Sequence, residues 1–405
     1  MDIVVERGAG LDVHKKAVVV TVETPDFRET RTFGTTTVRL REMAQWLESL
    51  GVTHIAMEST GPYWKPIYNV LEEFSFEILV CNAHHIKAVP GRKTDVKDSA
   101  WICSLLRHGL LRPSFIPSKE QRELRELVRY RKSLIRERAN EINRIQKVLE
   151  GANIKLASVA TDIMGVSGRK ILQAMIAGFT NAGELAEMAK GRLQEKKDEL
   201  EEALVGIIGP HQRLILREQL GHIDDLDARI ERLSQEVNQR MRPFSEALDH
   251  LDTIPGIGRQ TAETIVAEIG VDMSRFPSAA HLASWAGLCP GNNESAGKRK
   301  SGRTRKGSPA LRETLVEAAR AASRTKATYL NAQYHRIAAR RGAKRAAVAV
   351  AHSLIVITYH ILQRGTTYQD LGFDYFDRKN KETVARRLTH RLEAMGFRVT
   401  IEEAA

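Results

Sequence analysis

The N-terminal part of the chain alternates between short apolar runs and turn residues, and this order restricts the fold more than any other feature. Apolar residues that recur every second position predict strands, and those that recur every third and fourth position predict helices. The expected elements are strands over 8–14, 16–24 and 29–36, a helix over 38–50, a strand over 53–58, a helix over 63–74 and a strand over 76–81. A three-stranded meander followed by alternating helices and strands predicts a mixed α/β sheet.

Four carboxylates fall at the points where a ribonuclease-H-like fold, which has this element order, would bring them together. Asp12 lies in the first strand, and Glu58 ends the fourth. Asp95 and Asp98 are three residues apart in a segment where Thr94 can cap a helix, so both carboxylates are expected on one helical face. Each acid taken alone would most often be a solvated surface charge, and it is the combination that predicts a functional site.

Clustered carboxylates also restrict the chemistry. Four anions held together repel one another, so they need cations between them. Oxygen-only ligands suit Mg²⁺ or Mn²⁺, and a metal pair is a usual device for cutting phosphodiesters. We therefore expect a ribonuclease-H-like, metal-binding catalytic domain over residues 1–115.

The charge balance indicates the kind of partner. The chain has 62 Lys and Arg residues against 50 Asp and Glu residues, which gives a formal net charge of +12. Such an excess favours binding to polyanions through counterion release, although an unrelated basic protein would share it. With 405 residues, the chain is long enough for two or three domains with cores of their own.

Cysteine usage and hydropathy indicate the compartment. Cys81, Cys103 and Cys289 show no paired spacing, which predicts reduced thiols with neither a disulfide framework nor a zinc site. No signal peptide opens the chain, and the longest apolar stretch, 346–362, is interrupted by two histidines. We expect that stretch to be a buried helix, and the protein to be cytoplasmic with no membrane partner.

The middle of the chain, residues 116–245, is expected to be a helical coiled-coil segment. Apolar residues recur every seven positions in a stretch without Gly or Pro, at Val128, Ile135, Ile142 and Leu149. Arg131 and Arg138 occupy the other seam positions, which leaves two cations open to nucleic acid. A second helix is expected over 211–241. These helices predict either an arm for self-association or an antiparallel pair within one chain.

Residues 246–405 are expected to form a mainly α domain that begins with a helix-hairpin-helix. The turn is Ile254-Pro255-Gly256-Ile257-Gly258, and a helix follows it. Gly256 and Gly258 would let backbone amides approach phosphates without sequence preference. The alternative is a plain interhelical turn that contains glycine.

A polar, glycine-rich loop over 290–308 is the second candidate site. Its six cations suit phosphate binding and are Lys298, Arg299, Lys300, Arg303, Arg305 and Lys306. Ser295 has small neighbours that leave its hydroxyl accessible. From the pattern alone, Ser301 and Ser308 are equally plausible nucleophiles. A helix is expected to begin at about Pro309 or Ala310.

These features together resemble the insertion-sequence-110 family of transposases, which is related to the Piv-type DNA invertases. The resemblance rests on the four acids, the helical middle, Ile254-Pro255-Gly256-Ile257-Gly258 and Ser295-Ala296-Gly297-Lys298, and it spans nearly the whole chain. One departure is Ser308 before Pro309, where the family more often has Asn; a hydroxyl still caps that helix.

The resemblance implies a transposase that cuts and rejoins DNA, with an N-terminal RuvC-like domain, a coiled-coil segment and a C-terminal transposase domain. Asp12, Glu58, Asp95 and Asp98 would bind the divalent metal, and Ser295 would attack DNA covalently. The implied partners are donor and target DNA, a structured noncoding bridge RNA as guide, and further copies of the chain in a dimer or tetramer. Two alternatives remain: a RuvC-type junction nuclease in which water attacks, and a non-enzymatic nucleic-acid-binding protein.

Overall fold

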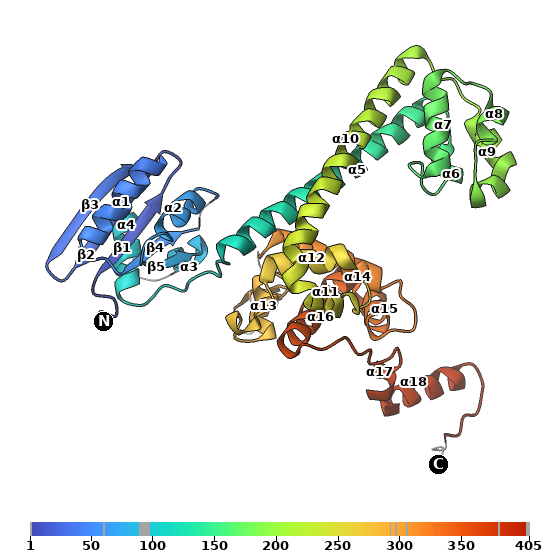
Figure 1. The fold of residues 1–405 in the computed structure, drawn as a ribbon. Helices are drawn as coiled ribbons and strands as arrows, with labels where there is room; N and C mark the ends of the chain where they lie inside the picture. The colour runs from blue at the N-terminus through green and yellow to red at the C-terminus, as the bar shows by residue number, and fades with distance from the viewer. Residues whose placement is uncertain are drawn as a thin grey trace. The chain divides into compact units, whose positions relative to one another are not determined.

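The computed structural model describes residues 2–59, 61–88, 98–291, 293–295, 298–304, 307–379 and 381–401. The chain folds into two compact units, Met1–Ile116 and Pro117–Ala405 (Figure 1). The first is built on a mixed sheet, and the second is mainly helical.

The first unit contains a five-stranded sheet with the order β3-β2-β1-β4-β5. Its strands are β1 (Gly8–Val13), β2 (Ala17–Thr24), β3 (Phe27–Gly34), β4 (His54–Glu58) and β5 (Glu77–Cys81). β1, β2 and β3 form an antiparallel meander, while β4 and β5 run parallel to β1. Each strand lies where the sequence predicts one, so the expected α/β order is confirmed.

Helices cover both faces of this sheet: α1 (Thr37–Ser49), α2 (Trp64–Leu71), α3 (Ala83–Ala88) and α4 (Asp98–Arg107). Strand residues alternate between the two faces. Leu11 and Met57 lie in one core with α1 and α2, whereas Ala56 packs with α3 and α4 on the other face. The described part of the helix expected around Asp95 and Asp98 is α4, and Thr94 and Asp95 lie outside the described residues.

Two long helices pair within the second unit, α5 (Lys119–Gly151) and α10 (Pro210–Met241). Arg240 reaches Glu123 at 3.0 Å, and Arg138 pairs with Asp227, so the helices run antiparallel (Figure 1). Shorter helices cap their far ends: α6 (Leu156–Val159), α7 (Val166–Ala177), α8 (Ala182–Ala186), η1 (Gly191–Lys196) and α9 (Lys197–Leu204). The intramolecular pair, one of the two alternatives from the sequence, is what the structure contains.

The remaining helices form the C-terminal part: η2 (Arg242–Phe244), α11 (Ser245–Asp252), α12 (Arg259–Ile269), η3 (Met273–Arg275), α13 (Ala279–Trp285), α14 (Pro309–Ala322), α15 (Tyr329–Arg341), α16 (Ala343–Arg364), α17 (Tyr375–Lys379) and α18 (Lys381–Ala394). In the part of the chain that the structure describes, α16 is the one helix with the length and composition of a membrane span. Half of its most apolar window is buried, as in the core helix of a folded domain. Its apolar residues Val350, Leu354 and Ile355 are fully buried.

The turn between α11 and α12 contains two glycines, Gly256 and Gly258, and packing accounts for the first of them. Gly256 has φ +87°, which favours glycine, and an added Cβ would lie 2.6 Å from the backbone nitrogen of Ala322 in α14. The approach of α14 therefore explains why this position needs glycine. Gly258 caps α12 and would hold a Cβ in open space.

The two glycines allow a matched test of this packing. Gly256→Ala forces a left-handed alanine and pushes a Cβ into α14, so we expect the free energy of unfolding to fall by roughly 2–5 kcal/mol. Gly258→Ala should cost less than about 1 kcal/mol, because nothing lies near its Cβ. Urea unfolding followed by circular dichroism measures both, and equal losses would contradict the packing role of Gly256.

Candidate active site

Asp12 is the second-last residue of β1, and Glu58 is the last residue of the neighbouring parallel strand β4. The last paired residues of β1 and β4 are Leu11 and Met57, both fully buried on the face that α1 and α2 cover. Since side chains alternate along a strand, the next residues, Asp12 and Glu58, share the opposite face. The Asp12 side chain is 27% exposed, and Glu58 is half-buried. Two of the four predicted acids are therefore adjacent at the carboxyl end of the sheet, where α/β folds place their ligands.

Helix α4 brings Asp98 to the same end of β1. A Cβ added to Gly10 would lie 2.8 Å from Cys103 Cα, and one added to Gly8 would lie 3.3 Å from Arg107 Cγ. The helix therefore runs antiparallel to β1 and directly against it, with its later residues over the start of the strand. Its first residue, the exposed Asp98, consequently lies toward the end of the strand that carries Asp12.

Polar contacts fix α4 on the sheet. The Ser99 hydroxyl lies 2.8 Å from the Thr21 hydroxyl, which lies 2.9 Å from that of Thr30. At the other end of the helix, Arg107 pairs with Glu23 of β2. The sequence analysis did not identify the contact between Thr21 and Ser99. A polar threonine in the valine-rich run of a buried strand was the available signal for it.

His14 is a further residue at this site that sequence reasoning missed. Its Nε2 lies 3.0 Å from Oδ2 of Asp12, across the turn that joins β1 to β2. An imidazole that donates there holds the carboxylate in one orientation. The sequence signal was the pattern Asp12-Val13-His14, in which residues two apart share a face.

The donor atoms of the described acids, though not their spacing, suit a hard divalent cation. Asp12, Glu58 and Asp98 offer only oxygen ligands, which suit Mg²⁺ or Mn²⁺. Burial raises the pKa of Cys81 to about 11 and that of Cys103 to about 12, so both thiols stay protonated at neutral pH. Among the described residues, no three His, Cys, Asp or Glu side chains gather closely enough to hold a metal, and Asp95 lies outside those residues.

The predicted serine loop is a β-hairpin rather than an irregular loop. β6 (Asn293–Ser295) pairs antiparallel with β7 (Lys298–Ser301), and Ser295 stands opposite Lys298. The two residues that connect them, 296 and 297, lie outside the described residues. Below the strands, the Gly291 N–H donates to the Arg303 carbonyl at 2.9 Å. The hairpin therefore places the backbones of Ser295 and Lys298 side by side at its tip.

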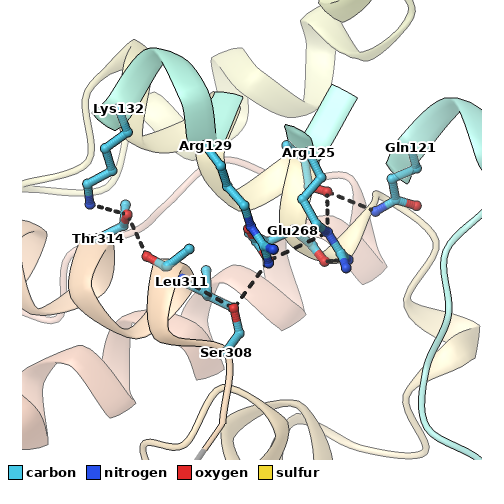
Figure 2. Close-up of polar contacts among 10 residues, drawn as sticks. Gln121, Arg125, Arg129, Lys132, Glu268, Ser308, Leu311 and Thr314 are labelled. Carbon is cyan, nitrogen blue, oxygen red and sulfur yellow. Dashed lines mark hydrogen bonds and ion pairs between the residues drawn. The ribbon is translucent and has the colours of Figure 1, made fainter. Parts of the chain in front are cut away.

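The hairpin ends at the start of α14. As the sequence predicts, α14 begins at Pro309, and the Ser308 hydroxyl caps it by accepting from the Leu311 N–H at 3.4 Å. The Ser308 N–H donates to the carbonyl of Trp285, the last residue of α13. Figure 2 shows that the Ser308 hydroxyl also faces Glu268 of α12.

The predicted nucleic-acid-binding cations fall into two groups. On the hairpin, Lys298, Arg299 and Lys300 belong to β7, Arg303 is exposed, and Arg305 and Lys306 lie outside the described residues. The two arginines of the helical middle are placed differently from what the sequence suggested. The Arg131 side chain is buried and pairs with the buried Glu263 at 2.6 Å, and Arg138 is paired with Asp227. We therefore regard Arg131 as a packing residue, because a buried and paired guanidinium cannot reach a phosphate.

Comparison with known proteins agrees with this geometry. Residues 9–154 match the DEDD domain model of IS110 transposases, described as a transposase, and residues 248–335 match the transposase IS116/IS110/IS902 family. A probable family 20 transposase from Pseudomonas aeruginosa is 26% identical over 78% of this chain and 85% of that protein. The transposase for insertion sequence element IS1111A from Coxiella burnetii is 24% identical over 82% of this chain and 84% of that protein.

The two matched regions contain the sheet unit with Asp12, Glu58 and Asp98, and the helical part with the Ser295 hairpin. Together they cover more than half of the chain. The chain is therefore a transposase of the IS110 family.

Proposed function

We propose that this transposase cuts and rejoins DNA through a covalent link to Ser295, with divalent metal held by Asp12, Glu58, Asp95 and Asp98. The observation that carries the proposal is the pairing of Ser295 with Lys298 at the tip of the hairpin. A serine there has a cation as its backbone neighbour and belongs to a segment rich in phosphate-binding residues. The sheet unit supplies the carboxylates, two of which lie at the ends of adjacent strands or one residue before.

The reaction conserves phosphodiester bonds. The Ser295 Oγ attacks a DNA phosphorus, forms an Oγ–P bond and gives up its proton to a nearby base. The P–O bond to one deoxyribose breaks, and that oxygen takes up a proton as it leaves. The hydroxyl of another DNA strand then attacks the phosphoserine link and releases Ser295. Because one phosphate ester replaces another in each step, rejoining needs no external energy source.

Several side chains have defined parts in this scheme. A divalent cation at the carboxylates would neutralise phosphate charge and lower the proton affinity of an attacking hydroxyl. His14 holds Asp12 in place, and the cations of the hairpin segment bind the DNA backbone. Exchange between two duplexes favours a dimer or tetramer. A structured bridge RNA as guide and the Piv-like character are further parts of the proposal that come from the family resemblance. Cytoplasmic action is a part that comes from the unpaired cysteines and the hydropathy of the sequence.

The carboxylates can be tested with isosteric changes. Asp12→Asn, Glu58→Gln or Asp98→Asn should reduce recombination by roughly a hundredfold or more and leave DNA affinity nearly unchanged, since affinity depends on the cations elsewhere. Asp26→Asn, in the exposed turn between β2 and β3 of the same unit, is the matched control and should recombine normally. Strand-exchange assays in Mg²⁺ and Mn²⁺ measure the effect. Full exchange by the Asp12 variant would remove that residue from the site.

Ser295 is tested with a DNA substrate that can be cut but not rejoined. The parent protein should become covalently attached, and the attached peptide should contain Ser295. Ser295→Ala should lose both the adduct and strand exchange, because alanine has no nucleophile. Ser301→Ala, in the other strand of the same hairpin, should keep both. Undiminished cutting by Ser295→Ala without an adduct would support the alternative, a junction nuclease that uses water.

If the cations of the hairpin segment bind phosphates, the affinity for DNA should depend on the salt concentration. The parent affinity for DNA should fall steeply as salt rises. Neutralising Lys298, Arg299, Lys300, Arg303, Arg305 and Lys306 together should flatten the slope of log K against log salt by up to about 5. Arg138→Gln should leave the slope unchanged, because Asp227 already pairs with that guanidinium. Filter-binding titrations from low to high salt provide the slopes, and an unchanged slope in the six-residue variant would contradict phosphate binding by this segment.

A further inference from the structure

One face of α5 presents polar side chains to α12 and α14, about one helical turn apart (Figure 2). Gln121 Nε2 donates to the Ala267 carbonyl at 3.3 Å. Further along the helix, Arg129 donates to both oxygens of Glu268 at 2.6 and 2.8 Å, and Lys132 donates to the Thr314 hydroxyl at 2.8 Å. These contacts join the first helix of the second unit to α12, which lies before α13 and the hairpin in the chain, and to α14, which follows the hairpin.

Glu268 is the centre of this network. It is 1% exposed, so its charge depends on its partners in the protein. Besides Arg129, it accepts a hydrogen bond from the Ser308 hydroxyl at 3.2 Å, and Arg125 Nε lies 3.6 Å from Oε2. Glu268 thus connects two cations of α5 to the residue at which the hairpin segment ends.

The two roots of the hairpin meet at this point. An added Cβ at Gly307 would lie 2.6 Å from the carbonyl carbon of Ala286, so the returning chain packs directly on the end of α13. The Ser308 N–H donates to the Trp285 carbonyl at 3.2 Å. The Arg125 guanidinium lies 5.9 Å from the ring centre of Trp285 and also donates to the Glu268 carbonyl. Both ends of the hairpin segment therefore lie against the ionic cluster around the buried Glu268.

We propose that Glu268 is a positioning residue for the Ser295 hairpin: it transmits the placement of α5, through Ser308, to the strand pair that carries the nucleophile. The inference rests on the proposed function only in taking Ser295 as the reacting group. Two strands of three and four residues have little stability of their own, so their roots fix their direction. A displacement of about 1 Å at a nucleophile can cost roughly a hundredfold in rate.

The chain offers a matched control in the same helix pair. Glu263, also on α12, is 2% exposed and pairs with Arg131 of α5 at 2.6 Å. Its other ion pair joins it to Arg259, so its partners lie on α5 and α12 rather than at the hairpin root. Glu263→Gln therefore removes a buried charge from the same interface without touching Ser308.

Hydrogen exchange tests the positioning without any chemistry. Glu268→Gln should speed exchange of the backbone amides of 293–295 and 298–301, whereas Glu263→Gln should leave them at the parent rate. Both variants should lose some thermal stability, because each leaves an arginine without its carboxylate. Equal exchange in the two variants would refute the positioning role. This readout is independent of whether Ser295 is the nucleophile.

A second experiment tests the effect of this positioning on the reaction rate. It measures single-turnover formation of the adduct well below the melting temperature. Glu268→Gln should slow formation of the Ser295 adduct by roughly tenfold or more with DNA affinity unchanged, and Glu263→Gln should not. Ser308→Ala should show the same defect, and Ser308→Thr should restore the rate because it keeps the hydroxyl. Slowing in proportion to lost stability in all four variants would overturn the proposal. Absence of the adduct in the parent protein would instead count against the proposed function.

Discussion

Two buried glutamates on α12 determine how α5 aligns with α12 in the second unit. Glu263 and Glu268 are almost completely buried, and their partners are Arg131 and Arg129 of α5. The effective cost of burying a charge is several kcal/mol per ion, so a carboxylate is tolerated there only while its arginine is opposite. A slip of α5 by one turn would break the contact between Arg131 and Glu263 and leave that glutamate with only Arg259 of its own helix, 3.6 Å away. The ion pairs therefore favour the observed alignment more strictly than purely apolar contacts would.

That alignment reaches the candidate nucleophile through a short chain of contacts. Glu268 holds the hydroxyl of Ser308, which in turn caps α14 and ends the hairpin segment. A catalytic side chain on a two-stranded hairpin depends on the rigidity of what supports it. The helix α5 is thus both a long scaffold and, through its cations, a support for the hairpin that carries the candidate nucleophile.

In the first unit the corresponding constraint is steric. Gly8 and Gly10 leave no side chains between β1 and α4, so the helix lies directly on the strand. The hydroxyls of Ser99 and Thr21 then fix its first turn, from which Asp98 projects. Asp12 and Asp98 are brought to one end of the sheet because the residues beside them are small or form hydrogen bonds, not because the acids attract each other.

The sequence by itself determined the order of the elements and the positions of Asp12 and Glu58 at strand ends, because periodicity and turn residues are local properties. It also predicted the start of α14, since a hydroxyl before a proline is a local capping signal. Only the tertiary structure decided the role of Arg131, whose partner Glu263 lies 132 residues away. The same holds for Gly256, which needs glycine because of α14, and for the hairpin around Ser295, where glycine- and cation-rich composition concealed the strand pairing. These outcomes depend on which distant groups meet, and a pattern read along the chain does not contain that information.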